Sequence, residues 1–89
     1  EERRQAPHII EGLRLAEKLY HAGETSGAAL EKAVREYWQT RIPGGVVDYL
    51  EFVHAENLSR LSVLGKSAIA AAAVKFSKAR LIDNIVLEA

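Results

Sequence analysis

The chain has 89 residues, of which 48% are hydrophobic and 27% charged, a composition typical of one folded domain rather than a disordered segment. Its 12 basic and 12 acidic side chains cancel, which argues against a nucleic-acid-binding face, so no nucleic acid is expected as a partner. The lack of cysteine excludes disulfides and thiolate metal sites. The sequence has no apolar run long enough to span a membrane and no signal-peptide pattern, so we expect a cytoplasmic protein without a membrane partner.

The first predicted helix covers about residues 1–22. Between Ile9 and Tyr20 apolar residues recur at intervals of three and four, which places them along one face of a helix. Pro7 has no backbone N–H, so it either starts the main helix or bends one that begins earlier, and Gly23 stops it. The chain opens inside this expected helix and without a methionine, which suggests a piece of a longer protein.

A second amphipathic helix is predicted over about residues 26–40. Thr25 or Ser26 is the candidate N-cap, because a side-chain oxygen there can accept a hydrogen bond from a free backbone N–H of the first turn. The sequence Pro43-Gly44-Gly45 ends the helix and marks the change to extended structure. The apolar stripe of this helix consists of Leu30, Ala33, Val34, Tyr37 and Trp38.

β-Branched and aromatic residues predict a strand over about residues 46–53. Both of its faces carry apolar side chains, which is typical of a strand covered on both sides. By alternation, one face presents Val47, Tyr49 and Val53 and the other presents Val46, Leu50 and Phe52. The same alternation puts Asp48 and Glu51 on opposite faces, where they could not act together as general acid and base.

The alanine-rich segment at residues 66–76 is open to two interpretations. Alanine is the best helix former, so local propensity favours a helix there and an all-helical adaptor as the whole protein. A strand with small side chains would instead allow close packing against a helical layer. Residues 80–88 read as a further strand, and the short turn at Ser77-Lys78 would make the two strands antiparallel.

Few side chains form a pattern that points to chemistry. Gly65-Lys66-Ser67 resembles the end of a phosphate-binding loop, but the earlier glycine of that motif falls on Arg60, so a turn is the better interpretation. The three histidines lack the paired spacing of metal ligands. Tyr37 and Trp38 could form a platform for a ligand, although their helical spacing favours the core. We therefore predict no catalytic, cofactor-binding or metal-binding residue in this segment.

Arg80, Asp83 and Asn84 are the sharpest functional candidates. A strand-like apolar run rarely carries three such groups, and each would need a partner if buried, because an unpaired buried polar group costs about 1–3 kcal/mol. Arg80 and Asp83 differ in parity, so they should face opposite sides of a sheet. We expect these residues to hold the last strand in place or to contact a neighbouring domain.

The polar run also carries a family resemblance. Ala79-Arg80-Leu81-Ile82-Asp83-Asn84-Ile85, preceded by Val74-Lys75-Phe76-Ser77-Lys78, resembles the C-terminal signature of the pantoate–β-alanine ligase family, the pantothenate synthetases. Two further segments match in the same order, Val47-Asp48-Tyr49-Leu50-Glu51 and Glu1-Glu2-Arg3-Arg4-Gln5-Ala6. The turn Phe76-Ser77-Lys78-Ala79 departs from the family, which often has Gly and Thr there. The resemblance covers nearly the whole chain, but only the C-terminal domain of the family.

The resemblance implies an α+β fold, in which two N-terminal helices pack on a three-stranded antiparallel sheet. In this single domain of residues 1–89 the strands would cover about 46–53, 66–76 and 80–88, so the alanine run would be a strand. The parent enzyme would condense pantoate with β-alanine at the expense of ATP, with Mg²⁺, through an acyl adenylate that gives AMP and pyrophosphate.

The family resemblance also implies where the catalytic parts are. A Rossmann-type N-terminal domain carries a His-x-Gly-His motif and the substrate glutamines, and a Met-Ser-Ser-Arg-Asn loop cradles the ATP phosphates; none of these motifs occurs here. This chain would be the lid that covers the active site, with the N-terminal catalytic domain as its partner and no activity alone. The alternative is a stand-alone α+β protein-interaction module without catalytic activity. What the parent gene encodes directly upstream distinguishes the two.

Overall fold

Two helices followed by a three-stranded antiparallel sheet make up the computed structural model, which describes residues 5–89. The parts of the first predicted helix and of the family resemblance that fall on residues 1–4 lie outside the described residues. The elements are α2 (Pro7–His21), α3 (Gly27–Arg41), β1 (Val46–His54), β2 (Ser67–Lys75) and β3 (Arg80–Glu88). The predicted α+β architecture is confirmed.

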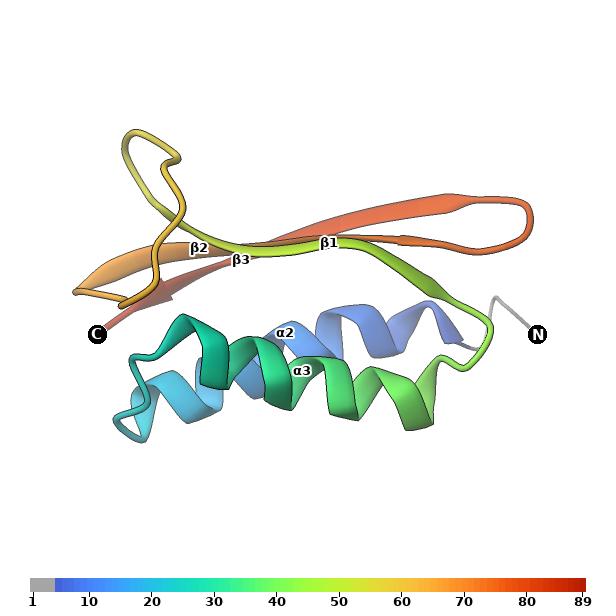
Figure 1. Cartoon of the computed structure of the whole chain (residues 1–89), viewed down its shortest axis with the longest axis horizontal. Helices are drawn as coiled ribbons and strands as arrows, with labels where there is room; N and C mark the ends of the chain where they lie inside the picture. Colours follow the sequence, from blue (N-terminus) through green and yellow to red (C-terminus); the bar gives the residue numbers. More distant parts are fainter. Residues whose placement is uncertain (1–4) are drawn as a thin grey trace.

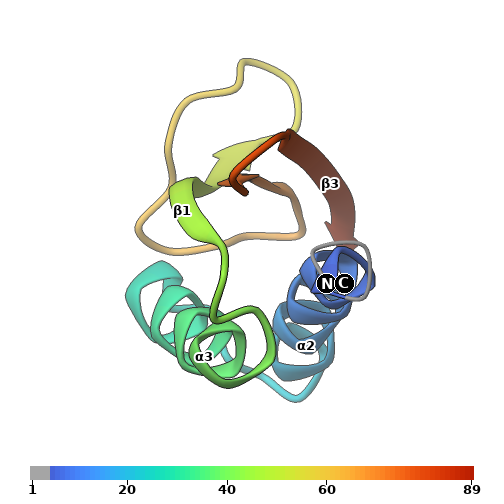
Figure 2. The ribbon, with the colours of Figure 1, turned by 90° about the vertical axis from the view of Figure 1, so that its right-hand side faces the viewer.

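The helices form one layer and the sheet another. Figure 1 shows α2 and α3 running antiparallel beneath the sheet, and Figure 2 shows both helices on the same side of it. The strand order is β1-β2-β3, with α3 in contact with β1 and α2 in contact with β2 and β3. Within residues 5–89 neither helix is long and apolar enough to cross a membrane.

Local signals set the helix ends. Pro7 occupies the first turn of α2, where its missing N–H has no intrahelical partner to lose, and the chain leaves the helix through Gly23, whose φ of 111° suits a residue without a side chain. Of the two candidate caps for α3, the structure uses Ser26. Its Oγ accepts a hydrogen bond from the backbone N–H of Ala29 at 3.3 Å.

The alanine-rich segment is the central strand of the sheet, so the all-helical interpretation was wrong. Every residue from Ser67 to Lys75 in β2 pairs with a residue of β3, and most also pair with β1. The side chains that alternate toward the helices are fully buried, namely Ala68, Ala70, Ala72 and Val74. The bulk of the core therefore comes from the neighbouring elements, and its largest fully buried side chains are Trp38, Leu13, Leu30 and Leu87.

A register shift in β1 changes the faces predicted for that strand. The pairing with β2 slips between Val47 and Tyr49, so that Asp48 is an extra residue. Val47 consequently packs against the core with Leu50 and Phe52, whereas the alternation rule had placed it opposite them. The helices cover this face alone, so the expected cover on both sides of β1 is missing over most of its length.

The connection at residues 55–65 protects the outer edge of β1 at its C-terminal end. The His54 N–H donates to the Ser59 carbonyl and the Leu61 N–H to the Phe52 carbonyl, both at 2.8 Å. Edge strands with unpaired backbone groups invite pairing with other chains, and a loop along the edge prevents it. The connection also rises above the sheet on the side opposite the helices (Figure 1), and its Arg60 forms an antiparallel bridge with the buried Val53.

Leucine substitutions at two adjacent alanines test the packing of β2. Ala72 is fully buried beneath the helices, whereas Ala71 is half-buried on the opposite side of the sheet. We expect Ala72→Leu to overpack the core and lower the free energy of unfolding by about 1–3 kcal/mol. Ala71→Leu should be nearly neutral. Chemical denaturation of the 89-residue chain measures both, and equal effects would contradict the two-layer packing.

A glycine inside α2 makes a second test possible. The Cβ of an alanine at Gly12 would overlap Nε1 of Trp38, whose ring crosses the helix at that point. We expect Gly12→Ala to destabilise the chain by roughly 1–3 kcal/mol, although alanine is about 1 kcal/mol better than glycine in a helix. Gly65→Ala is the matched control, because no atom lies within 4 Å of its added Cβ. A rise in the thermal midpoint of Gly12→Ala would refute the close contact.

Candidate functional site

The side of the sheet that faces away from the helices holds two of the three candidate residues. We call this side the outer face. Alternation and strand register assign to it Val46, Tyr49, Glu51, Val53, Ser67, Ile69, Ala71, Ala73, Lys75, Arg80, Ile82, Asn84, Val86 and Glu88. Most of these side chains are apolar, and they form the middle of the face, whereas the charged ones lie toward its ends and edges.

Arg80 lies on the outer face and reaches across β2 to β1. Its Nε donates to Oδ2 of Asp48 at 2.8 Å, and its guanidinium carbon lies 5.9 Å from the ring centroid of Tyr49. The ion pair is partly exposed, with 44% and 36% of the two side chains accessible. Exposed ion pairs contribute roughly 0–1 kcal/mol, so this pair fixes the positions of three side chains more than it stabilises the fold.

Asp83 and Asn84 point to opposite sides of β3. Asp83 lies in the row of Leu50 and Ala72 on the helix side, half-buried, and its Oδ1 accepts a hydrogen bond from the Asn84 N–H at 2.8 Å. The Asn84 side chain is exposed on the outer face beside Ala71. Arg80 and Asp83 thus occupy different faces, as alternation predicts, and the three polar residues do not form one cluster.

The bulge in β1 overturns the argument that separated Asp48 from Glu51. Asp48 contacts Arg80 on the outer face, and Glu51 belongs to the same face because it follows Tyr49 by two residues. The two carboxylates have different partners, however. Oε2 of Glu51 lies 3.9 Å from Nε of Arg60 in the 55–65 connection. Each carboxylate is therefore held by its own guanidinium group.

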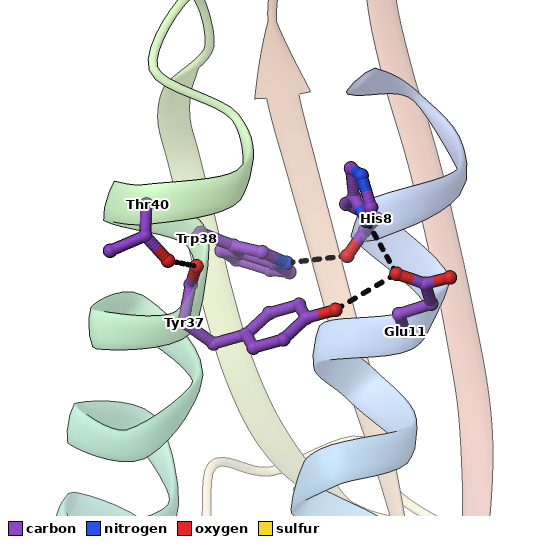
Figure 3. Close-up of polar contacts among 5 residues, drawn as sticks. All are labelled: His8, Glu11, Tyr37, Trp38 and Thr40. Atoms are coloured by element: carbon purple, nitrogen blue, oxygen red, sulfur yellow. Dashed lines mark hydrogen bonds and ion pairs between the residues drawn. The ribbon is translucent and has the colours of Figure 1, made fainter. Parts of the chain in front are cut away.

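A second polar group joins the two helices at the opposite side of the molecule (Figure 3). The Glu11 carboxylate accepts hydrogen bonds from the His8 ring and, at 2.8 Å, from the Tyr37 hydroxyl. Arg41 lies over the Tyr37 ring, 5.3 Å from its centroid. Trp38 also extends from α3 toward α2 but is buried in the core, where its Nε1–H donates to the His8 carbonyl at 3.0 Å. The core interpretation of Trp38 is confirmed.

These hydrogen bonds change two pKa values in opposite directions. The hydrogen bond from His8, followed by that from Tyr37, lowers the pKa of Glu11 below its usual 4.5 by stabilising the carboxylate. The same bond to Glu11, with some desolvation, raises the pKa of Tyr37 above 10.0, because the neutral hydroxyl is the donor. Sequence reasoning missed this junction, although the spacing of His8 and Glu11 on one helix face was a usable signal.

Other patterns in the sequence have structural explanations. Gly65-Lys66-Ser67 is a turn that enters β2, and the Gly65 carbonyl accepts a hydrogen bond from the Tyr20 hydroxyl at 2.5 Å. In the part of the chain that the structure describes, His, Asp and Glu side chains form no group of three or more that could hold a metal ion. The described residues therefore do not fit a Mg²⁺ site.

Comparison with known proteins defines the class of protein. The family model for pantoate-beta-alanine ligase matches residues 1–86. A crystal structure of pantothenate synthetase from Thermus thermophilus superposes on the whole chain with a TM-score of 0.90 at 31% identity. The two-layer α+β fold is thus that of one domain of a ligase. The chain belongs to the pantoate–β-alanine ligase family.

Sequence relatives give the same result over a limited part of their length. The chain is 48% identical to pantothenate synthetase of Oleidesulfovibrio alaskensis over 87 residues, which are 98% of this chain and 31% of that protein. It is 38% identical to the Bacillus subtilis enzyme over 99% of this chain and 30% of the relative. The Thermus thermophilus structure is covered to 32%. The chain therefore spans about a third of the length of its relatives.

The lowered pKa of Glu11 predicts a pH-dependent contribution to stability. A carboxylate whose pKa falls on folding stabilises the fold above its unfolded pKa of 4.5, and this contribution is lost as the pH falls through the lower folded value. We expect native protein to melt at a higher temperature than Glu11→Gln at neutral pH, and at the same temperature in strong acid.

The source of the shift can be checked by NMR titration of the Glu11 carboxyl. Tyr37→Phe removes one donor and should raise the pKa of Glu11 toward its usual value. Tyr49→Phe is the matched control, because Tyr49 lies on the other side of the molecule and has no contact with Glu11. Equal pKa values of Glu11 in native protein and Tyr37→Phe would contradict the assigned hydrogen bond.

Proposed function

We propose that this chain is the C-terminal lid domain of an ATP-dependent ligase that joins pantoate to β-alanine and releases AMP and pyrophosphate. Its partner is the N-terminal catalytic domain of the same enzyme, and the compartment is the cytoplasm. The observation that carries the proposal is the match of the whole chain, at a TM-score of 0.90, to a pantothenate synthetase of which it covers 32%.

The motifs missing from this chain support placing the chemistry in the rest of the enzyme. The chain contains neither a phosphate loop nor a His-x-Gly-His motif, and residues 5–89 offer no cluster of metal ligands. ATP, with Mg²⁺, and pantoate are therefore held mainly by the N-terminal domain. The lid contributes by closing over the site, which excludes water from an acyl adenylate that water would otherwise hydrolyse.

The three polar residues of β3 have structural and interdomain roles in this proposal. Arg80 is held by Asp48 and Tyr49, so its position on the outer face is fixed before any partner arrives. Asn84 is exposed further along the same face, beyond Ile82, where it can meet a neighbouring domain. Asp83 acts within β3 through the Asn84 N–H.

A stand-alone interaction module is the second candidate. The same two-layer domain could act through its exposed sheet without a catalytic parent. The sequence encoded directly upstream of this chain decides between the two, since the lid interpretation requires the phosphate loop and the catalytic domain there.

Separating the two parts of the enzyme gives a direct test. We expect the full-length protein from the parent gene to form AMP from ATP only when pantoate is present, and the purified 89-residue chain to form none. A far-UV circular dichroism spectrum with helix and strand components serves as the control that the short chain is folded. AMP formation by the short chain alone would overturn the division of labour between the domains.

A further inference from the structure

The outer face is too apolar for a sheet surface that stays in water. In an antiparallel sheet covered on one side, the solvent side normally carries polar residues. Here one row, next to the row of Arg80, runs Tyr49, Ala73 and Ile82 across the three strands, and the row nearer the 55–65 connection runs Val53, Ile69 and Val86. Between them Ala71 lies on the central strand, with Glu51 and Asn84 on the two edge strands. Apolar rows of this kind are typical of a sheet face that is covered by another layer.

The exposed fractions of the apolar side chains show which part of the outer face is in contact with water. Ile82 is 59% and Val86 51% exposed, and they are two residues on either side of Asn84 along the same face of β3. The outward surfaces of the helices differ, because they carry ion pairs such as Arg35 with Glu31 and Arg14 with Glu17. Of the two layers, the sheet has the surface whose removal from water would release free energy.

We infer that the outer face, centred on Ile82 and Val86, is the surface on which this domain docks against the N-terminal catalytic domain of the same polypeptide. This rests on the proposed function, and it specifies which side of the lid faces the rest of the enzyme.

The charges around the outer face and its small apolar area favour the N-terminal catalytic domain as the partner that covers it. The apolar rows are bordered by the Arg80–Asp48 pair at one end and by Glu51 with Arg60 at an edge, which is the mixture found where domains of one chain meet. Such interfaces are as small as roughly 600 Å², because the covalent link supplies a high effective concentration. A second copy of the chain would lack that advantage and would need a larger apolar surface.

The position of the start of α2 agrees with docking against a domain of the same polypeptide. The relatives contain about twice as much sequence outside this domain as inside it, since the chain covers 31% of their length. In Figure 1 the start of α2 lies at the same end of the molecule as the β2–β3 turn, next to which Arg80 begins β3. On the proposed function the catalytic domain precedes α2, and it would be tethered at the end of the sheet that carries the Arg80–Asp48 pair.

Thiol labelling in the full-length enzyme tests the docking surface. The 89-residue segment has no cysteine, so Val86→Cys and, separately, Val63→Cys each introduce one thiol that peptide mass spectrometry can follow. Val63 is the matched control, because it is the same residue type, 67% exposed, and lies in the 55–65 connection. We expect the thiol of Val86→Cys to react at least about tenfold more slowly than that of Val63→Cys.

Two results would overturn the inference. Equal labelling rates would mean that the outer face stays in water. Protection that grows with protein concentration would mean that a second copy, rather than the catalytic domain, covers it. Protection that is the same at all concentrations supports the inference.

Steady-state kinetics separates this inference from the proposed function. In the full-length enzyme we expect Val86→Asp to lower kcat/KM for pantoate by about tenfold or more and Val63→Asp to leave it within about twofold, with unchanged circular dichroism for both. An active native enzyme with equal labelling of the two thiols would refute the docking surface alone. A native enzyme that forms no AMP, with the thiol of Val86→Cys still protected, would refute the ligase function alone. Should Val86→Asp fail to fold, the labelling rates decide.

Discussion

The fold depends on the small side chains of its central strand. Ala68, Ala70 and Ala72 are fully buried and occupy little volume, so the helices can approach β2 closely and fill the space with Trp38 and Leu13. Trp38 fits only because α2 has a glycine where the indole crosses it, at Gly12. The small residues at one set of positions thus determine where the large side chains of another set can lie. Those large side chains in turn set the spacing of the two layers.

The same alanines explain how far sequence reasoning could go. The helix ends followed from Pro7, Ser26 and Gly23, because caps and breakers act within a few residues. The alanine segment was ambiguous, since its helix propensity is overruled by pairing partners that lie far away in sequence. The resemblance to a family, and not periodicity, identified the strand. The exchange of faces at Val47 was beyond prediction, because a bulge leaves no fixed mark on an alternating pattern.

The candidate residues could be predicted from the sequence, but the residues that contact them could not. The run from Arg80 to Asn84 is unusual enough to notice, and alternation correctly separates Arg80 from Asp83. The contact of Arg80 with Asp48 requires the strand order, the register and the bulge together, none of which one sequence provides. Glu11 was missed for a related reason, since one of its donors, Tyr37, is on another helix.

The arrangement of charge on the outer face would suit the proposed lid, which docks and separates repeatedly. A lid that buried an unpaired arginine would incur a desolvation cost on every closure, because an uncompensated charge is strongly disfavoured away from water. Arg80 avoids this, since Asp48 and the Tyr49 ring satisfy it within the domain. Closure would then be driven by the apolar rows around Ile82 and Val86 alone. Such a contact is modest, non-directional and easily reversed, whereas a directional interdomain ion pair would resist opening.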